Sequence, residues 1–573
     1  MPRAMAVGAA IGGAGGPATN AEAKLALLTP DELKCPVWEH FMTLTDIPRP
    51  SGAEEAVLKH IESLAEERGL EFNRDAIGNL VVRRPASGVG VVATCPVVIV
   101  QNHVDVVTEK ADGRSRSRGA GCTRPSPAPR TPRSPAVVLI LAGSAHDFTR
   151  DPVAVVRDGA GWLGTVGTTL GADNGVGAAA AMALLCLSPD DPRPMPPLEL
   201  LFTVDEEVGL GGAQGFDGSM VRGRILINLD TEEWGDVSIA CAGGGDTVIS
   251  VPPGARTPLE DPGVWRLLTI AIDGGLGGHS GLDIANDRAP AVRLVARVAA
   301  AALAAAGPAA RLDTLVGGDK RNAIARSATA RVVVPAAAAD AARIAAEAVG
   351  ANVISEFGPT EPDLVVSATV GDVDAAAVTP LDIVGTARLV SLLRALPHGA
   401  HKRSALLSGL VETSSNVASC KVDGDGHVVC VSTRSLMTPA LEDVRDVIDA
   451  VATAMGCSTT RNVAYPGWAP RADSAVVEVV ARAVAARLGP GLPGRDAVVV
   501  GGIHAGLECG ILGQRIRESR PEEGEATAFP DMASFGPTIR GAHSPDERCE
   551  VATVGPFWEA LVDILGELAV RAG

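Results

Sequence analysis

The stretch LELLFTVDEE, residues 198–207, joins a run of apolar residues directly to three consecutive carboxylates. A short apolar run bounded by polar residues is typical of a buried strand, here from Leu198 to Val204. Two further apolar runs end in the same manner: residues 96–100, followed by His103 and Asp105, and residues 224–229, followed by Asp230. Ligand sites of open α/β sheets lie beyond the carboxyl ends of parallel strands, so these runs predict a mostly parallel α/β sheet with a polar site at one edge.

Helices are predicted between these strands. The glycine-rich loop GTTLGADNG, residues 167–175, opens an alanine-rich helix over 175–187. Farther upstream, Ser51 and Glu54 have the S-x-x-E spacing of a capping box, which predicts a helix over 52–67. A closing helix is expected over 554–569. This alternation of strands and helices is the pattern of the α/β class.

The pattern changes after Gly243-Gly244-Gly245. Short strands then alternate with long alanine-rich helices; the clearest strands are 267–272, 330–334 and 364–370, and the clearest helices 289–305 and 339–356. We interpret residues 246–463 as an inserted α+β domain. The catalytic domain would then be discontinuous, with a first part over 23–245 and a second over 464–573.

Three segments fit neither domain. Residues 1–22 are rich in alanine and glycine, and we expect a disordered leader; an organelle transit peptide is the alternative, although arginine and serine are not enriched. Residues 111–145 hold six arginines against one aspartate, with several prolines and serines. Residues 516–529 are equally out of character. We interpret the last two as surface insertions, or as retained non-native coding sequence, and expect that joining Lys110 directly to His146 leaves folding intact.

The composition excludes several classes of protein. The chain has 573 residues, of which 46% are hydrophobic and 21% charged, as in a globular protein. A net charge of −18, only 3% aromatic residues and a single tyrosine argue against a nucleic-acid partner. No apolar run approaches the ~20 residues of a membrane helix, so no membrane partner is expected. Ten cysteines without a C-x-x-C pair favour reduced thiols and a cytoplasmic location.

Five potential metal ligands stand at predicted turns: His103, Asp173, Glu207, Asp230 and His543. Two imidazoles and three carboxylates suit two Zn²⁺ or similar divalent ions with one carboxylate bridging them. Two further carboxylates stand beside these ligands. Asp105 follows His103 by two residues, so on an extended segment it shares a face with the imidazole and can orient it. Glu206 adjoins Glu207 and could act as general base towards an activated water.

These residues lie in strings that resemble the M20 metallopeptidase family, in its branch of aminoacyl-histidine dipeptidases (peptidase D, cytosolic non-specific dipeptidases). The matching strings are NHVDVV (102–107), HDFTRDP (146–152), GTTLGADNGVG (167–177), LFTVDEEVGLGGA (201–213), LINLDTEE (226–233), GGHSGLDI (277–284), GGDKRNAIAR (317–326), GLVETSSN (409–416), YPGW (465–468), IHAGLECG (503–510) and DMASFGPTIRGAHSPDER (531–548). The resemblance spans nearly the whole chain, and several strings are characteristic of this branch.

The resemblance implies a role for each candidate residue. His103 and Asp230 would hold one metal, Glu207 and His543 the other, and Asp173 would bridge them. Asp105 matches the residue that orients the metal histidine, and Glu206 matches the general base. The inserted domain matches the family's lid, whose residues His279, Asn322 and Arg434 would bind substrate, His279 by stabilising the oxyanion. His504 resembles a position close to the site, and its role stays open.

We therefore expect a metal-dependent dipeptidase that hydrolyses dipeptides, Xaa-His among them, with a dinuclear zinc-activated water and Glu206 as general base. The expected cofactors are two divalent ions, Zn²⁺ first, with Co²⁺ or Mn²⁺ as alternatives. The expected partner is a small peptide substrate, and a homodimer is left open. The alternatives are another M20 amidase, such as an aminoacylase or tripeptidase, and a non-catalytic binding protein of the same fold.

Overall fold

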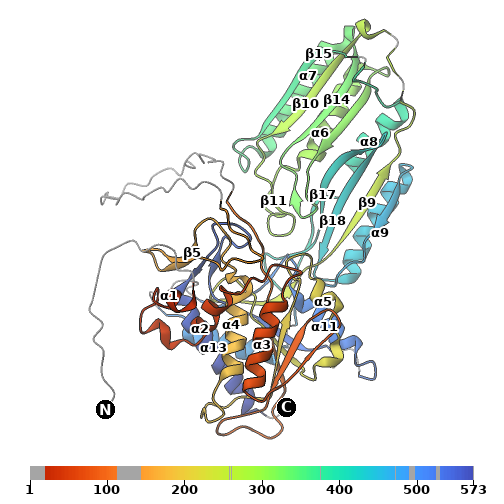
Figure 1. Ribbon diagram of the computed structural model, residues 1–573. Helices are drawn as coiled ribbons and strands as arrows, with labels where there is room; N and C mark the ends of the chain where they lie inside the picture. The colour runs from red at the N-terminus through yellow and green to blue at the C-terminus, as the bar shows by residue number, and fades with distance from the viewer. Residues whose placement is uncertain are drawn as a thin grey trace. The chain divides into compact units, whose positions relative to one another are not determined.

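The structure is a computed structural model that describes residues 20–111, 144–256, 258–259, 261–374, 376–471, 473–489, 497–523 and 529–571. The chain divides into two compact units (Figure 1). The first comprises Met1–Ser238, Asp473–Val500 and Arg515–Gly573, and the second comprises Ile239–Ala472 and Gly501–Gln514. No helix among the described residues is long and apolar enough to cross a membrane.

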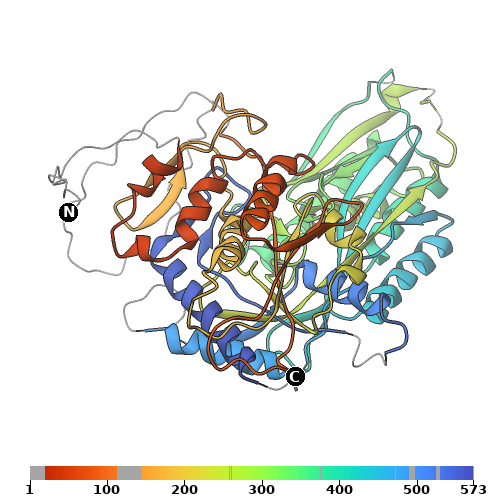
Figure 2. The same cartoon turned by 60° about the horizontal axis from the view of Figure 1, so that its bottom comes forward.

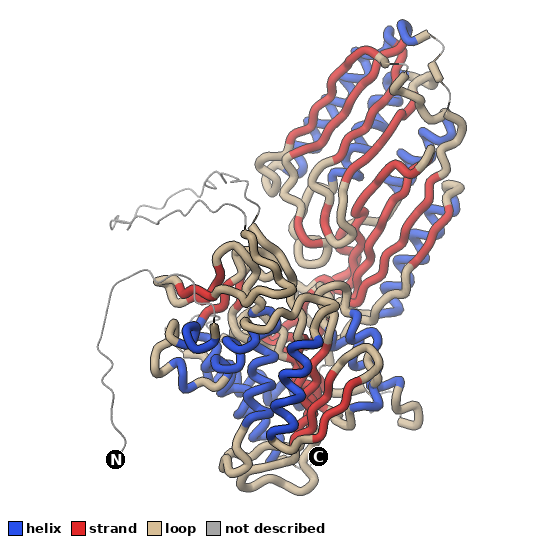
Figure 3. Tube along the Cα trace, viewed as in Figure 1, coloured by secondary structure: helices blue, strands red, loops and turns tan. Residues whose placement is uncertain are grey.

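An eight-stranded sheet organises the first unit (Figure 3). Its order is β1 (Glu71–Arg74), β2 (Leu80–Arg84), β6 (Leu198–Thr203), β3 (Val98–His103), β7 (Ile225–Asn228), β21 (Asp531–Ser534), β8 (Asp236–Cys241) and β20 (Val499–Ile503). The four central strands, β6, β3, β7 and β21, pair in parallel, whereas β2 and β8 flank them antiparallel. The carboxyl ends of the central strands therefore share one edge, where ligand sites of such sheets form.

The helices that accompany this sheet in the sequence are α1 (Ala21–Leu25), α2 (Val37–Leu44), α3 (Glu55–Glu67), α4 (Ala172–Cys186), α5 (Gly211–Gly215), α10 (Ala475–Arg487), α11 (Glu508–Glu518) and α13 (Val551–Ala569). Of these, α3, α4 and α10 pack against strands of the sheet, whereas α1 contacts α2, α2 contacts α4 and α13 contacts α10. The alanine-rich α4 is buried along almost its whole length, because small side chains let it lie close to β3 and to α2. Figure 2 shows α2, α3 and α4 side by side. A smaller sheet has the order β22 (Ile539–Arg540), β23 (Arg548–Glu550), β5 (Trp162–Thr165) and β4 (Val155–Arg157).

The second unit is a nine-stranded sheet covered by helices on one face (Figure 3). The sheet runs β15 (Val365–Asp372), β10 (Trp265–Asp273), β14 (Ala328–Pro335), β12 (Arg311–Gly317), β17 (Val411–Asp423), β18 (Gly426–Ser435), β9 (Gly243–Val251) and β19 (Ser458–Arg461), with β16 (Gly399–Arg403) paired to β17. The helices are α6 (Ala291–Ala306), α7 (Ala339–Phe357), α8 (Ile383–Ala395) and α9 (Thr438–Ala454). Alanine and valine side chains from both layers form its core.

The α/β class predicted from the sequence is confirmed, and the central strands β6, β3, β7 and β21 of the first sheet pair in parallel. The unit boundaries differ from the predicted 246 and 463. Gly244 pairs with Tyr465 and Cys241 with Trp468, so these flanks belong to the second unit. The segment 501–514 joins the same unit, since the Ala242 N–H donates to the carbonyl oxygens of residues 503 and 505.

The predicted capping box is wrong. Helix α3 begins at Glu55, and no side chain caps it. The Ser51 hydroxyl donates instead to Asp105 Oδ2 at 2.8 Å, and Glu54 Oε1 accepts from the backbone N–H groups of Gly52 at 2.8 Å and Asp205 at 3.1 Å. Both side chains therefore form hydrogen bonds with loops at the carboxyl edge of the sheet. The S-x-x-E spacing is the same whether the two side chains cap a helix or bind such loops, so the sequence alone does not distinguish the two.

Parts of the predicted leader, residues 1–22, and of the predicted second insertion, residues 516–529, belong to the folded structure. The N–H of Ala21 donates to Asp46 Oδ2 at 2.7 Å, so the fold begins before residue 23, while residues 1–19 lie outside the described residues. The interpretation of 516–529 as a surface insertion is contradicted for residues 516–520. Ile516 is fully buried at the end of α11, and Arg520 is only 9% exposed.

The predicted insertion 111–145 lies largely outside the described residues, but its two ends are described. The N–H of Ser144 donates to the Ala111 carbonyl oxygen at 3.3 Å, so the ends lie side by side. Lys110 Nζ also donates to the His146 carbonyl oxygen at 3.2 Å. The chain segments on the two sides of the insertion are therefore close enough to be joined by a short connection.

We expect a variant that joins Lys110 directly to His146 to fold, with a melting temperature within a few degrees of the full chain, and to keep or increase its peptidase activity. An arginine- and proline-rich sequence with little helical or strand pattern is not expected to form a core of its own. Circular dichroism during heating and turnover of a dipeptide would measure both effects. A variant that does not fold, or whose KM rises, would show that the segment is integral.

Candidate active site

The carboxyl edge of the first sheet gathers the seven residues that the sequence predicts as ligands or catalytic groups. His103 ends β3 and stands level with Thr203, the last residue of β6, so the Asp205–Glu207 loop begins beside it. Asp230 follows β7 by two residues. Asp173 lies in the first turn of α4 and His543 in the loop between β22 and β23. Five separate chain segments therefore meet at one edge.

Asp173 lies between the two histidines. Its Oδ1 is 3.3 Å from His103 Nε2, and its Oδ2 is 3.2 Å from His543 Nε2. Asp230 Oδ1 stands 3.4 Å from the same nitrogen of His103, and Glu207 Oε2 stands 2.9 Å from that of His543. The Nε2 atom of each histidine thus lies within 3.4 Å of Asp173 and of one further carboxylate. Asp173 is therefore common to two groups of potential metal ligands.

Three sets of side chains could each hold a metal ion, since one donor atom from every member lies within 4.8 Å of the others: His103, Asp173 and Asp230; Asp173, Glu207 and His543; His103, Glu206 and Glu207. The first two sets share Asp173. Imidazole and carboxylate donors in groups of three, with room for a further ligand, are the donor sets of catalytic zinc sites. The residues present therefore fit a pair of divalent ions.

Asp105 supports this arrangement in two ways. Its Oδ1 lies 3.4 Å from His103 Nδ1, on the side of the ring away from Asp173, so it directs Nε2 towards the other carboxylates. It also accepts hydrogen bonds from the backbone N–H groups of Glu206 and Glu207, both at 3.1 Å. The sequence predicted that Asp105 orients His103. In the structure it also positions Glu206, the predicted general base, and Glu207, a predicted ligand.

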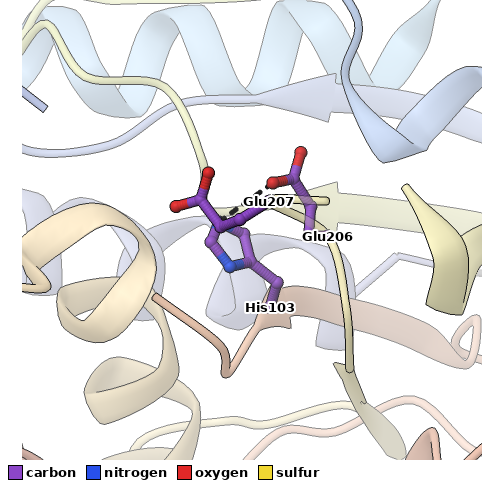
Figure 4. Close-up of side chains that lie close together, drawn as sticks. All are labelled: His103, Glu206 and Glu207. Carbon is purple, nitrogen blue, oxygen red and sulfur yellow. Dashed lines mark ion pairs between the residues drawn. The ribbon is translucent and has the colours of Figure 1, made fainter. Parts of the chain in front are cut away.

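Glu206 and Glu207 diverge from one loop. Figure 4 shows the two carboxylates on either side of the His103 ring, and Glu206 Oε2 is 4.0 Å from His103 Nε2. Glu207 instead approaches His543. Asp205, directly before them in this loop, has a φ of 51°, a left-handed conformation that is unfavourable for a residue with a side chain. Such backbone strain is concentrated at functional sites.

The excess of carboxylates shifts the pKa values of the site. Hydrogen bonds to Asp173 and Glu207 raise the pKa of His543 to about 11, against the opposing effect of burial. Burial raises the pKa of Asp230. Burial also opposes ionisation of Asp105, but hydrogen bonds from His103 and Ser51 lower its pKa to about 2. The cluster of carboxylates therefore stabilises positive charge at the positions of the two histidines, as a site for cations requires.

The residues predicted to bind substrate form a separate cluster in the second unit. Arg434 Nη2 is 3.4 Å from His279 Nε2, and Arg434 Nε donates to the Ser280 hydroxyl at 3.2 Å. The Ser280 N–H donates to the carbonyl oxygen of Asn322 at 2.9 Å. His279, Asn322 and Arg434 are thus brought together around the buried Ser280, although 155 residues separate His279 from Arg434.

Two further residues belong to this cluster. His504, whose role the sequence left open, is 4% exposed, and its Nε2 lies 2.7 Å from the hydroxyl of Ser414. Burial, together with Arg434 and His279, lowers its pKa to about 3, so its imidazole is neutral. Tyr465, the only tyrosine of the chain, accepts a hydrogen bond from Arg434 Nη1 at 3.2 Å. The string YPGW contained Tyr465, but nothing in the sequence linked it to Arg434.

A parallel sheet whose carboxyl edge holds imidazoles and carboxylates in two ligand groups, with a further carboxylate beside them, is typical of metal-dependent hydrolases. The comparison with protein families agrees with this class. Residues 167–567 match the model of peptidase family M20/M25/M40. The chain belongs to this family, and it is a peptidase, a hydrolase of peptide bonds.

Two relatives are similar over nearly their whole length. The cytosol non-specific dipeptidase of Escherichia coli (strain K12) is 32% identical over 542 residues, which cover 94% of this chain and 98% of that protein. The crystal structure of aminoacylhistidine dipeptidase from Vibrio alginolyticus has a TM-score of 0.75 and 32% identity, and covers 94% of this chain and 97% of that chain. The family and the branch indicated by the sequence strings are thus confirmed.

Proposed function

We propose that this protein is a dinuclear metal-dependent dipeptidase. The observation that carries the proposal is that Asp173 directs one carboxylate oxygen to each histidine, so that two ligand groups share it. Both similar proteins are named as dipeptidases, one of them for aminoacyl-histidine substrates, and this supports dipeptides, Xaa-His among them, as the substrate class. We infer a cytosolic location from the name of the E. coli relative.

We propose that His103 and Asp230 hold one divalent ion, that Glu207 and His543 hold the other, and that Asp173 bridges them. Zn²⁺ suits imidazole and carboxylate donors, and Co²⁺ or Mn²⁺ would suit them as well. When bound, such a pair lowers the pKa of a water molecule and polarises a carbonyl oxygen. Because Asp105 occupies the Nδ1 side of His103, the ring offers Nε2 to the metal.

Glu206 is the proposed general base. It belongs to the same loop as the proposed ligand Glu207, and its Oε2 lies 4.0 Å from His103 Nε2, beside the proposed metal ligands. It takes the proton of the attacking water while the water oxygen bonds to the peptide carbonyl carbon. The same carboxyl group then delivers the proton to the leaving amine as the carbon–nitrogen bond breaks, which yields two free amino acids from a dipeptide.

Arg434 is the proposed anchor for the carboxylate of the substrate. Its guanidinium is a planar fork that binds a carboxylate through two parallel hydrogen bonds, and Ser280, Tyr465 and His279 fix its orientation. We propose that Asn322 binds backbone polar groups of the same substrate and that His279 stabilises the oxyanion. In a dipeptide the free carboxylate lies one residue from the scissile bond, so an anchor for this carboxylate would favour dipeptides over longer peptides.

The purified protein should hydrolyse dipeptides such as Xaa-His and turn over a carboxyl-amidated dipeptide and a tetrapeptide poorly. Arg434→Lys keeps the charge but loses the fork, so we expect it to raise KM for the dipeptide about tenfold or more, the cost of roughly one charge-assisted hydrogen bond. Steady-state kinetics on the three substrates would measure both effects.

Arg445→Lys is the matched control, because Arg445 is also a buried arginine of the second unit and donates to the backbone oxygens of Asp246 and Asn462. It should leave KM unchanged. Comparable turnover of the dipeptide, its amide and the tetrapeptide would exclude a carboxylate anchor and favour a broader amidase or tripeptidase. A protein that binds these peptides without hydrolysing them would be the binding protein that the sequence left as an alternative.

A further inference from the structure

The carboxylate of Glu547 is buried against the loop that carries Asp173. Its Oε2 accepts hydrogen bonds from the backbone N–H groups of Leu170 at 2.7 Å and Gly171 at 2.9 Å. Its Oε1 accepts from the N–H groups of Ala172 at 2.7 Å and Asp173 at 3.2 Å. One side chain, only 3% exposed, thus binds four consecutive N–H groups at the start of α4.

Arg49 holds the same loop from its carbonyl side. Its Nη2 donates to the Gly171 carbonyl oxygen at 2.7 Å, and its Nη1 donates at 2.7 Å to the carbonyl oxygen of Val104, the residue between His103 and Asp105. Arg49 is 4% exposed. This guanidinium therefore ties the loop of the proposed bridging ligand to the end of β3.

The peptide groups of Gly171 are held from two directions, the N–H by Glu547 and the carbonyl oxygen by Arg49. Gly171 has φ +72°, and a Cβ there would lie 2.8 Å from Val106 Cγ1 and 3.0 Å from Arg49 Nη2. A Cβ on Gly175 would lie 2.5 Å from the same nitrogen. The two glycines in GADNG thus make room for Arg49 as well as for the turn.

We infer that Arg49 and Glu547 are positioning residues that form a clamp, and that this clamp sets the Asp173 carboxylate between the two ligand groups. Neither side chain belongs to a proposed ligand set. Glu547 lies four residues after His543, so the clamp links the chain segments of His543, Asp173 and His103 through two side chains. A bridging carboxylate must present both oxygens at once, so its backbone has little freedom to shift. The inference rests on the proposed function, since it concerns the same metal pair.

The first unit contains a second pair of residues with the same bonding but far from the ligands, and it provides matched controls. Glu199, at the start of β6, accepts from the N–H groups of Arg222 and Gly223, and Arg520 donates to the carbonyl oxygens of Val221 and Gly223. Both are also buried. Glu199→Gln and Arg520→Lys remove the same kind of hydrogen bonds without touching the Asp173 loop.

The experiment compares Glu547→Gln and Arg49→Lys with these two controls in the full chain. Glutamine keeps the size of Glu547 but turns an NH₂ group towards two N–H donors. Lysine keeps the charge of Arg49 but cannot reach two carbonyl groups as a fork does. Each metal-free protein is titrated with Co²⁺, whose visible absorption reports ligand geometry. Thermal unfolding of the metal-free protein and kcat and KM for a dipeptide are measured in parallel.

We expect the two clamp variants to bind Co²⁺ about 10–100-fold more weakly, with an altered absorption spectrum and a lower kcat at nearly unchanged KM. The controls should lower the melting temperature of the metal-free protein but leave the spectrum, the Co²⁺ affinity and kcat as in wild type. Clamp variants that bind Co²⁺ like wild type would overturn the inference alone. The inference would also be overturned if both clamp variants failed to fold while the controls folded, because Arg49 and Glu547 would then serve the stability of the fold and not the position of Asp173. A wild-type chain that binds no Co²⁺ would overturn the proposed function.

Discussion

Glu206→Gln should lower kcat by about 10²–10⁴-fold, the usual contribution of a positioned general base, while the protein keeps its metal ions. Glutamine preserves the size and hydrogen-bonding capacity of the side chain but cannot accept the proton of the attacking water. The structure favours this outcome because Glu206 stands 4.0 Å from His103 Nε2, whereas Glu207 approaches His543 Nε2 to 2.9 Å. Turnover of a dipeptide and elemental analysis of the same sample would measure both quantities.

Two neighbouring variants make this test specific. Glu207→Gln should lose metal, because Glu207 is a proposed ligand. Asp205→Asn alters the charge of the same loop without removing a proposed ligand or base, so it should retain both metal and activity. If Glu206→Gln lost metal while Glu207→Gln kept it, the roles of the two adjacent carboxylates would be reversed.

Removing the metal should abolish activity. Purified protein should carry about two divalent ions per chain, and a chelator should inactivate it until Zn²⁺ or Co²⁺ is restored. His103→Ala and His543→Ala should each lose at least one of the ions and most of the activity, because the Nε2 atom of each histidine lies close to Asp173 and to a second proposed ligand. Mass spectrometry of the metal content, together with dipeptide turnover, checks these outcomes.

His60→Ala serves as the control for these variants, since His60 lies on α3 and belongs to none of the three ligand sets. It should keep the metal content and activity of wild type. Full activity in the metal-free protein would exclude a metal-dependent mechanism. Loss of only one ion in both histidine variants, with activity retained, would indicate a single catalytic metal.

Much of the candidate site could be predicted because its residues stand at the ends of recognisable strands. The apolar runs before His103, Asp205 and Asp230 predict buried strands. Parallel strands end at a common edge, so polar side chains after them are brought together whatever their distance in the sequence. Asp173 and His543 do not follow strands of that sheet. Their place in the site rested on the family strings around them, and the structure brings both to the same edge.

The second unit could be predicted only in outline. Alternating strands and alanine-rich helices indicate its α+β layers, but they do not define its limits. The chain enters and leaves through backbone pairs between Gly244 and Tyr465 and between Cys241 and Trp468, which no local pattern reveals. The contact of Tyr465 with Arg434 depends on the same pairing.

The sequence by itself determined the fold class, the family and the proposed metal ligands, because strand patterns are local and the family strings are contiguous. Only the tertiary structure decided which residues besides Asp105 hold those ligands in place. Ser51 and Glu54 have the spacing of a capping box but bind the Asp105 and Asp205 segments instead. Glu547 and Arg49 bind backbone groups more than a hundred residues away. A hydrogen bond to a distant backbone group requires no particular residue type at the partner position, so it leaves no pattern in the sequence.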